Sequence, residues 1–275
     1  MTHDEAFLEA IREAPDDDTP RLLCADWLEE GGDPRGEFIR VQCARAKLPP
    51  DDPLTQPLMR RAWELFSANH DAWVGPIREL VGPDFYRRGE SWLGRGRLEA
   101  IPEKVGKYPR GFVEELTLDA DRFFAAADQS SRLVVLRSVQ LWGAGARPHL
   151  LKESSRLTYL ESLSCTDHYM DPFNDKCARA LAASPHVARL TALRLRANHV
   201  GDAGAEALAG APWLARLRLL DLARNGLSLA GVEALAASPN LSHSCAVYLG
   251  NEHLDRDALA RLADAHGRPL NQFMF

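Results

Sequence analysis

Two stretches of the sequence share one pattern of leucines: Leu190-x-x-Leu193-x-Leu195-x-x-Asn198-x-Val200 and Leu217-x-x-Leu220-x-Leu222-x-x-Asn225-x-Leu227. The second stretch lies 27 residues after the first. The phrase Ala-Leu-Ala keeps the same step of 27 residues, because it recurs at 180–182, 207–209 and 234–236 with a proline after each copy. Two independent markers with one period indicate an internal repeat, in which each unit forms the same piece of structure.

The repeating unit is predicted to be a strand, a turn and a helix. A short Leu-x-Leu alternation is typical of a strand with one buried face, and the stretch of small residues that follows suits a closely packed helix. Each unit also carries an asparagine where the strand ends. An inward-turned amide can bond loop backbone groups that neither strand nor helix satisfies, so Asn198 and Asn225 are predicted to hold the turns.

The pattern weakens away from this centre in both directions. On the C-terminal side, Val247-x-Leu249 holds the step of 27 residues, while Asn251 stands one place early. Such a degenerate copy is expected of a terminal cap. On the N-terminal side, weaker copies are placed at Leu160-x-x-Leu163-x-Cys165, Leu136-x-x-Val139-x-Leu141 and Val113-x-x-Leu116-x-Leu118. The array is therefore predicted to begin near Gly111 and to hold about five or six units.

The unit resembles the leucine-rich repeat of the ribonuclease-inhibitor type, in which strand and helix alternate. This resemblance is specific over residues 190–241 and fades outward. It implies an α/β solenoid over residues 111–275, with parallel strands on the concave face and helices on the convex face.

The N-terminal part of the chain shows helical periodicity instead of the repeat. Apolar spacing, capping residues and glycines predict helices over 5–12, 20–30 and 34–42, and two more over 54–80. We therefore expect an all-helical module over residues 1–82.

The stretch from Asp16 to Gln42 looks like the bacterial repeat-companion domain, a module that accompanies repeat arrays. The resemblance covers residues 4–45 and implies an intracellular bacterial protein, but no established activity. Between the two parts, residues 83–110 are interpreted as a connector or N-terminal cap.

Composition narrows the class of protein. The 275 residues are 45% hydrophobic and 26% charged, which is typical of a globular chain. No apolar run is long enough for a membrane helix, and the acidic start does not resemble a signal peptide. Five cysteines at wide spacings favour reduced thiols, so a cytoplasmic location is predicted. A net charge of −6 argues against broad capture of nucleic acid or anionic lipid.

Candidate chemical sites are weak. The acids Asp16, Asp17, Asp18 and Asp26 lack the alternating spacing of a calcium loop. Ion pairs within the module are expected instead, in which Asp26 and Glu37 pair with Arg21, Arg35 and Arg40. Cys165, His168 and Cys177 do not form the paired spacings of a structural zinc site. Hydrolase, phosphate-loop and dinucleotide motifs are absent from the sequence. We therefore expect no enzyme activity, no metal and no cofactor.

The outward positions of the strands are the predicted functional surface, because stacked parallel strands align them as a ladder. Aromatic residues and arginine carry a large share of interface energy. The predicted partner-binding residues are Trp142, Arg194, Arg196, Asp221, Tyr248 and Gln140. For single residues another interpretation stays open, in which Arg194 pairs with Asp221 and Trp142 packs under a loop.

These observations predict an intracellular scaffold that binds a partner protein on the concave face; its oligomeric state stays open. One alternative is nucleic-acid binding by the basic connector, through Arg87, Arg88, Arg95, Arg97, Lys104, Lys107 and Arg110, with Trp92 and Tyr108 for stacking. A second alternative is an enzyme with a site between the helical module and the first repeats.

Overall fold

The computed structural model describes residues 3–81, 109–125, 134–166, 171–250, 255–269 and 273–274, with no side-chain description for Arg256 and Met274. The chain divides into two compact units. Unit 1 holds Met1–Thr117 and Ala126–Arg137, and unit 2 holds Leu118–Ala125 and Ser138–Phe275.

Unit 1 contains the helices α1 (His3–Glu13), α2 (Thr19–Glu30), α3 (Arg35–Ala46) and α4 (Thr55–Val81). The prediction of two helices over 54–80 is wrong, because α4 is one continuous helix with Pro76 inside it. Its buried side chains keep helical spacing on both sides of this proline, at Leu65, Phe66, Trp73 and Ile77. A continuous buried face stabilises the helix although the proline removes one backbone donor.

The core of unit 1 joins the helices to chain segments that come much later in the sequence. Ile11, Ala25 and Ile39 pack in one buried cluster with Phe112 and Val135. The short 3-10 turn η2 (Pro109–Gly111) lies against α3. Gly111 has a φ of +88°, and a Cβ there would lie 2.7 Å from the Cα of Ile39, so glycine permits this contact.

One sheet runs through the repeats, and its strands follow one another in sequence order from β1 to β7. They are β1 (Val113–Asp119), β2 (Val134–Trp142), β3 (Ser162–Thr166), β4 (Ala192–Arg194), β5 (Leu219–Asp221), β6 (Ala246–Tyr248) and β7 (Phe273–Met274). Each neighbouring pair from β2 to β7 is parallel.

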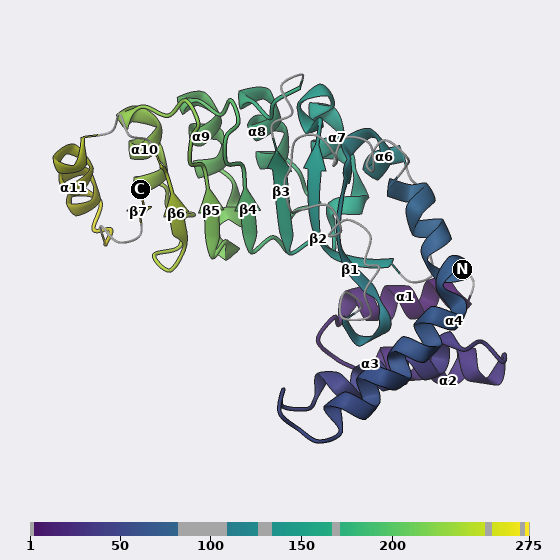
Figure 1. The fold of residues 1–275 in the computed structure, drawn as a ribbon. Helices are drawn as coiled ribbons and strands as arrows, with labels where there is room; N and C mark the ends of the chain where they lie inside the picture. Colours follow the sequence, from purple (N-terminus) through teal and green to yellow (C-terminus); the bar gives the residue numbers. More distant parts are fainter. Residues whose placement is uncertain are drawn as a thin grey trace, which may run out of the picture. The chain divides into compact units, whose positions relative to one another are not determined.

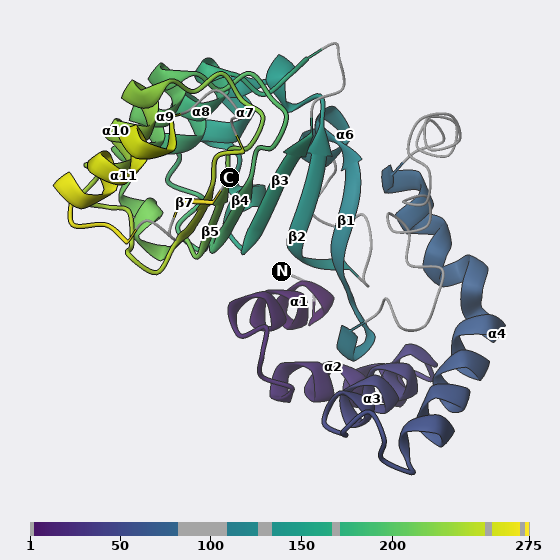
Figure 2. The same ribbon diagram turned by 60° about the vertical axis from the view of Figure 1, so that its left-hand side comes forward.

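Helices connect the strands of unit 2 and lie on one side of the sheet (Figures 1 and 2). They are α6 (Ala120–Ala125), α7 (Pro148–Glu153), α8 (Asp175–Ala182), α9 (Asp202–Ala209), α10 (Leu229–Ala236) and α11 (Arg256–Ala265). The 3-10 turns η3 (Ala144–Ala146), η4 (Ser155–Leu157) and η5 (Pro212–Arg216) complete the connections. The predicted fold class, an α/β leucine-repeat solenoid after a helical N-terminal part, is confirmed.

The repeat leucines fill the interior in the predicted register. Val139, Leu163, Leu193, Leu220 and Val247 are aligned across neighbouring strands, and all five are fully buried. Leu195 and Leu222 are fully buried as well. Burial of each such side chain contributes about 1.5–3 kcal/mol, so the repeated positions stabilise the stack together.

The two repeat asparagines hold the turns as predicted. Asn198 accepts a hydrogen bond from the backbone N–H of Phe173 at 2.9 Å and donates to the carbonyl of Cys165 at 2.8 Å. Asn225 repeats this pattern, accepting from Val200 at 2.9 Å and donating to Leu195 at 2.8 Å. Each amide therefore joins its own turn to the preceding repeat.

A second ladder joins the helix starts. Asp175 Oδ1 accepts hydrogen bonds from the backbone N–H groups of Gly201, at 2.7 Å, and Gly204, at 3.1 Å. Asp202 occupies the same place one repeat later and caps α10 in the same way. The carboxylates satisfy amide groups that helix starts leave open. Leu229 takes the equivalent position in α10, so this ladder ends there.

The five cysteines are buried free thiols. Burial raises the pKa of Cys24 and of Cys245 to about 11, and that of Cys43 to about 12. Among the residues that the structure describes, no helix has both the length and the apolar character needed to cross a membrane.

Candidate functional site: the outward face of the sheet

The outward positions of β2 to β6 form one aligned row. Gln140 is in register with Ser164, Ser164 with Arg194, Arg194 with Asp221, and Asp221 with Tyr248. Parallel neighbours lie about 4.8 Å apart, so the row crosses the strands at regular steps. We call these five residues the sheet-face row.

The members of the row differ in exposure. Arg194 is exposed, while Gln140, Ser164, Asp221 and Tyr248 are half-buried. All five remain partly accessible, and all five carry groups that form hydrogen bonds. The row is therefore a polar surface with one cation, one carboxylate and one aromatic hydroxyl.

Trp142 does not belong to this accessible surface, and its predicted exposure is wrong. Only 8% of it is exposed, although the alternation along β2 assigns it outward. It lies in the row where strands end, with Thr166, Arg196, Ala223 and Gly250. Neighbouring repeats approach closely in this row, since Ala223 is buried and a Cβ on Gly250 would lie 2.7 Å from the Cβ of Ala223.

Arg194 leans toward the preceding repeat. Its Nη1 donates to the hydroxyl of Ser162 at 2.8 Å. Asp221 stands beside Arg194 in register, but its Oδ1 accepts from the backbone N–H of Ala223 at 3.0 Å. The two side chains therefore bond other groups, and the alternative in which Arg194 pairs with Asp221 is wrong.

Further arginines surround this row, and two of them, Arg218 and Arg224, lie beyond the predicted set. Arg196 follows β4 and is exposed, as the prediction requires. Arg218 directly precedes β5 and Arg224 follows it, and both are exposed. Leucine spacing alone did not reveal them, because they lie outside the Leu-x-Leu alternation. Arg218 and Arg224 take the places of Thr191 and Ala197 in the preceding unit, so the period carried no signal for arginine there.

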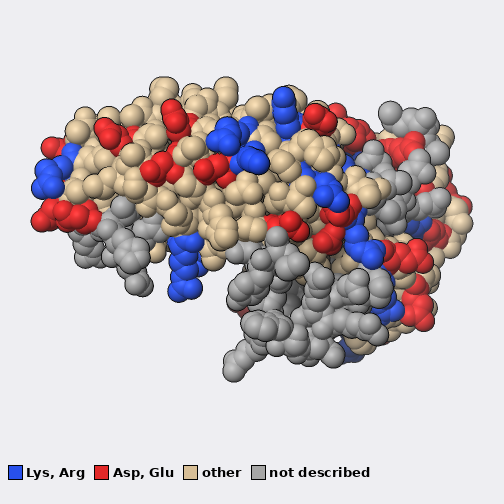
Figure 3. Space-filling view, turned by 90° about the horizontal axis from the view of Figure 1, so that it is seen from above, with Lys and Arg blue, Asp and Glu red and all other residues tan. Residues whose placement is uncertain are grey.

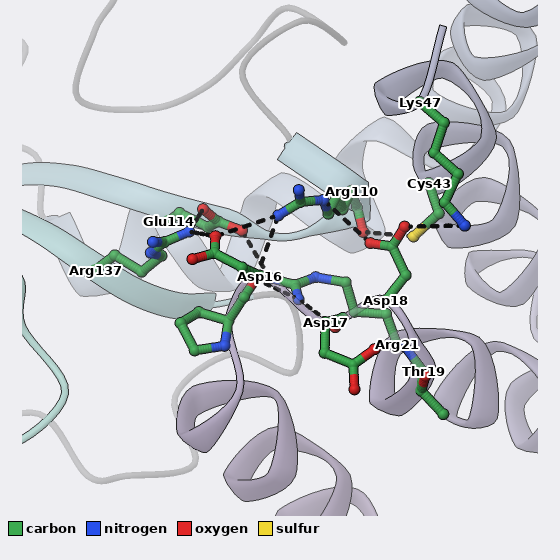
Figure 4. Close-up of polar contacts among 11 residues, drawn as sticks. Asp16, Asp17, Asp18, Thr19, Arg21, Cys43, Lys47, Arg110, Glu114 and Arg137 are labelled. Carbon is green, nitrogen blue, oxygen red and sulfur yellow. Dashed lines mark hydrogen bonds and ion pairs between the residues drawn. The ribbon is translucent and has the colours of Figure 1, made fainter.

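The acidic stretch after α1 forms ion pairs within unit 1 (Figure 4). Asp16 lies 2.9 Å from Nη1 of Arg137, and Asp18 lies 3.1 Å from Nε of Arg110 and 3.3 Å from Nζ of Lys47. Within the described ranges, no group of three His, Cys, Asp or Glu side chains could hold a metal ion.

Arg21 is the buried centre of this network. It is fully buried and donates to Glu114 Oε1 at 2.8 Å and to the carbonyl of Pro15 at 2.7 Å. Burial raises the pKa of Glu114, and the charges of Arg21 and Arg137 oppose this rise. A buried pair with these backbone bonds fixes how the chain after α1 meets β1, which is a structural role.

The other predicted ion pairs of the module are only partly correct. Arg40 pairs with Asp26 and Glu29 at the surface, and Glu37 pairs with Arg61 at 2.6 Å. Arg35 bonds Asp33 within its own turn. Asp26 is exposed, so its pair with Arg40 lies at the surface.

Two alternative sites, the basic connector and the zinc site, include residues outside the described ranges. Residues 87–108 of the basic connector and His168 of the zinc alternative lie outside the described residues. Arg110 is described, and it pairs with Asp18. Cys165 and Cys177 are buried, and burial raises the pKa of both thiols.

The architecture defines an α/β solenoid of strand-turn-helix units. A family model described as Leucine Rich repeat matches residues 190–209 and 217–236, which contain β4 with α9 and β5 with α10. The chain therefore carries leucine-rich repeats, a class that supports a general role in protein–protein interaction. No curated protein matches the chain.

Proposed function

We propose that the chain is a bacterial cytoplasmic scaffold that binds a partner protein on the concave face of its sheet. In this proposal, residues 111–275 are an array of ribonuclease-inhibitor-type repeats and residues 1–82 are a helical module with the repeat-companion domain. Residues 83–110 connect them. No catalytic role is assigned to either part.

The observation that carries the proposal is the in-register row on the sheet face. Five strands each supply one partly or fully exposed polar side chain, at a constant step, on one side of a buried leucine layer. A rigid scaffold holds these groups in place before binding. Binding of a partner therefore costs little conformational entropy of the scaffold. Side chains of arginine and tyrosine are frequent hot spots in such interfaces.

The helix side provides a comparison surface. Seen from above, the repeats show uncharged surface with acidic and basic side chains scattered over it (Figure 3). The equivalent helix positions are occupied by Arg179, Glu206 and Glu233, which are exposed and stand 27 residues apart. These three residues provide a matched control for the sheet face.

The test is affinity capture from native lysate with three forms of the chain. A sheet-face variant combines Arg194→Ala, Asp221→Ala and Tyr248→Ala, and a helix-face variant combines Arg179→Ala, Glu206→Ala and Glu233→Ala. We expect the sheet-face variant to lose the partner captured by the wild type and the helix-face variant to retain it. Equal melting temperatures check that both variants are folded. Retention by the sheet-face variant with loss by the helix-face variant would reject the proposal.

A further inference from the structure

Exposed arginines gather where β4 and β5 lie side by side. Arg194 ends β4 and Arg196 follows two residues later, while Arg218 and Arg224 flank β5. All four side chains are exposed. We call these four residues the arginine cluster.

The backbone distributes the members of the arginine cluster along β4 and at both ends of β5. Arg194 is the last residue of β4, and Arg196 lies two residues further on, in the turn that follows. The N–H of Arg218 donates to the carbonyl of Thr191 at 2.8 Å, so Arg218 lies beside the start of β4. Arg224 stands at the other end of β5, with a φ of 57° in a turn.

The local charge of the cluster is opposite to that of the chain. Asp221 lies between Arg218 and Arg224, and its Oδ1 already accepts from the backbone of Ala223. The cluster therefore sets four guanidinium groups against one carboxylate on β4 and β5, in a chain with a net charge of −6.

The guanidinium groups of the cluster are not used to hold the fold. That of Arg194 donates to the Ser162 hydroxyl, a neutral group. Across residues 171–250, Arg196, Arg218 and Arg224 form no ion pair with a carboxylate. By contrast, Arg21 and Arg110 in unit 1 are both engaged by acids. Exposed cations that have no acid partner among the described residues are available to a ligand that supplies carboxylates.

We infer that the arginine cluster recognises an acidic segment of the partner protein, an extended stretch that carries several carboxylates. This inference rests on the proposed function and names the chemistry of its ligand. Guanidinium groups bind carboxylates through paired hydrogen bonds, and the Tyr248 hydroxyl beside Asp221 provides a further polar contact. A protein segment is favoured over nucleic acid because Asp221 interrupts the cluster, and a peptide, unlike a phosphate backbone, can place an uncharged residue against it.

The test measures binding of a fluorescein-labelled peptide of alternating glutamate and alanine by fluorescence polarisation at low salt. The variant Arg196→Glu with Arg218→Glu is compared with the control Arg179→Glu with Arg261→Glu. The control arginines are exposed on α8 and α11, and both variants change the net charge equally. We expect the cluster variant to bind at least about tenfold more weakly and the control to change affinity by less than about twofold.

Three results would overturn the inference: no peptide binding by the wild type, equal losses in both variants, or tighter cluster-dependent binding of a labelled oligothymidine than of the peptide. Capture of the lysate partner by the same variants separates this inference from the proposed function. If the sheet-face triple variant loses the partner but the cluster variant keeps it, the proposed function stands and the acidic ligand is rejected. If the sheet-face triple variant keeps the partner while the helix-face variant loses it, the proposed function itself fails.

Discussion

The carboxylate of Asp202 receives two hydrogen bonds from Ser228, one from the backbone N–H at 2.8 Å and one from the hydroxyl at 2.6 Å. Asp202, at the start of α9, therefore places its negative charge at the start of α10 in the next repeat. Burial raises the pKa of Asp202, but the bonds from Ser228 and Gly231 outweigh this and lower it below the usual 3.8.

The lowered pKa predicts a pH-dependent effect of Asp202→Asn. A depressed folded-state pKa adds stability above the unfolded value of 3.8, and this stability is lost as pH falls through the folded pKa. At neutral pH we expect the variant to be about 1 kcal/mol less stable, a modest value because the group is partly exposed. The difference from wild type should vanish in acid. Urea unfolding across a pH series measures it, and a difference that stays constant down to low pH would contradict the assignment.

The asparagine ladder predicts unequal costs for two equivalent substitutions. Asn198 is 3% exposed, whereas Asn225 is half-buried. Asn198→Ala leaves the Phe173 N–H and the Cys165 carbonyl unsatisfied, so we expect a loss of about 2–4 kcal/mol. Water can replace part of the bonding at Asn225, so its loss should be smaller.

Urea unfolding of the two alanine variants compares them directly. Exposed His199→Ala serves as a control and should change the free energy of unfolding by less than about 0.5 kcal/mol. Equal stability of the Asn198 variant and the wild type would show that the ladder does not hold the turns.

The sequence predicted those features of the repeats that depend on periodicity. Leucine spacing gave the register from Val139 to Val247. The position of each asparagine at the end of its strand indicated a bond to loop backbone, but not that Asn198 and Asn225 also bond the preceding repeat. The carboxylates of Asp175 and Asp202 were not predicted, although they also stand 27 residues apart. Their partners lie in the following unit, and a contact between units is visible only when the stacking is known.

The candidate site was predicted less well for the same reason. Alternation along a strand assigns Trp142 to a side of the sheet, but exposure depends on how closely neighbouring repeats approach. The single helix α4 shows a related limit, since Pro76 alone suggests a break and only the packed face overrides it.

The buried ion pair of unit 1 predicts a large contrast between two arginines. Arg21 is fully buried against Glu114, while Arg40 pairs with acids at the surface. Arg21→Met leaves the buried carboxylate of Glu114 without its hydrogen-bond donor, so we expect a loss of about 3–5 kcal/mol. Arg40→Met should cost less than about 1 kcal/mol.

The pH dependence of the Arg21 variant gives a further check. Glu114 has a raised folded-state pKa, so its contribution is full below the unfolded value of 4.5 and is lost as pH rises through the folded pKa. Removal of Arg21 raises this pKa further. The defect should therefore be larger at neutral pH than in acid, measured by thermal unfolding, and a larger defect in acid would reject the role of Glu114.

Arg268 follows α11 and bonds the backbone of the preceding repeat. Its buried guanidinium donates to the carbonyls of Ala236 at 2.9 Å, Leu241 at 2.7 Å and Ser238 at 2.6 Å. In earlier repeats the equivalent carbonyl accepts a hydrogen bond from the following unit. Trp213 donates to the carbonyl of Ala182, and Ser238 donates to that of Ala209. Arg268, which follows α11, thus supplies the equivalent bond from the unit after α10.

We expect Arg268→Met to leave three buried carbonyls unsatisfied and to cost about 3 kcal/mol, concentrated in α10 and β6. Arg268→Lys should not restore stability, because one ammonium group cannot reproduce the planar fork. Hydrogen exchange read by mass spectrometry should show lost protection over residues 229–248 and little change over 192–209. Exposed Arg261→Met is the matched control in the neighbouring helix and should leave both segments protected. Uniform loss of protection across the array, or rescue by lysine, would show that the three bonds of Arg268 do not hold the segment around α10 and β6.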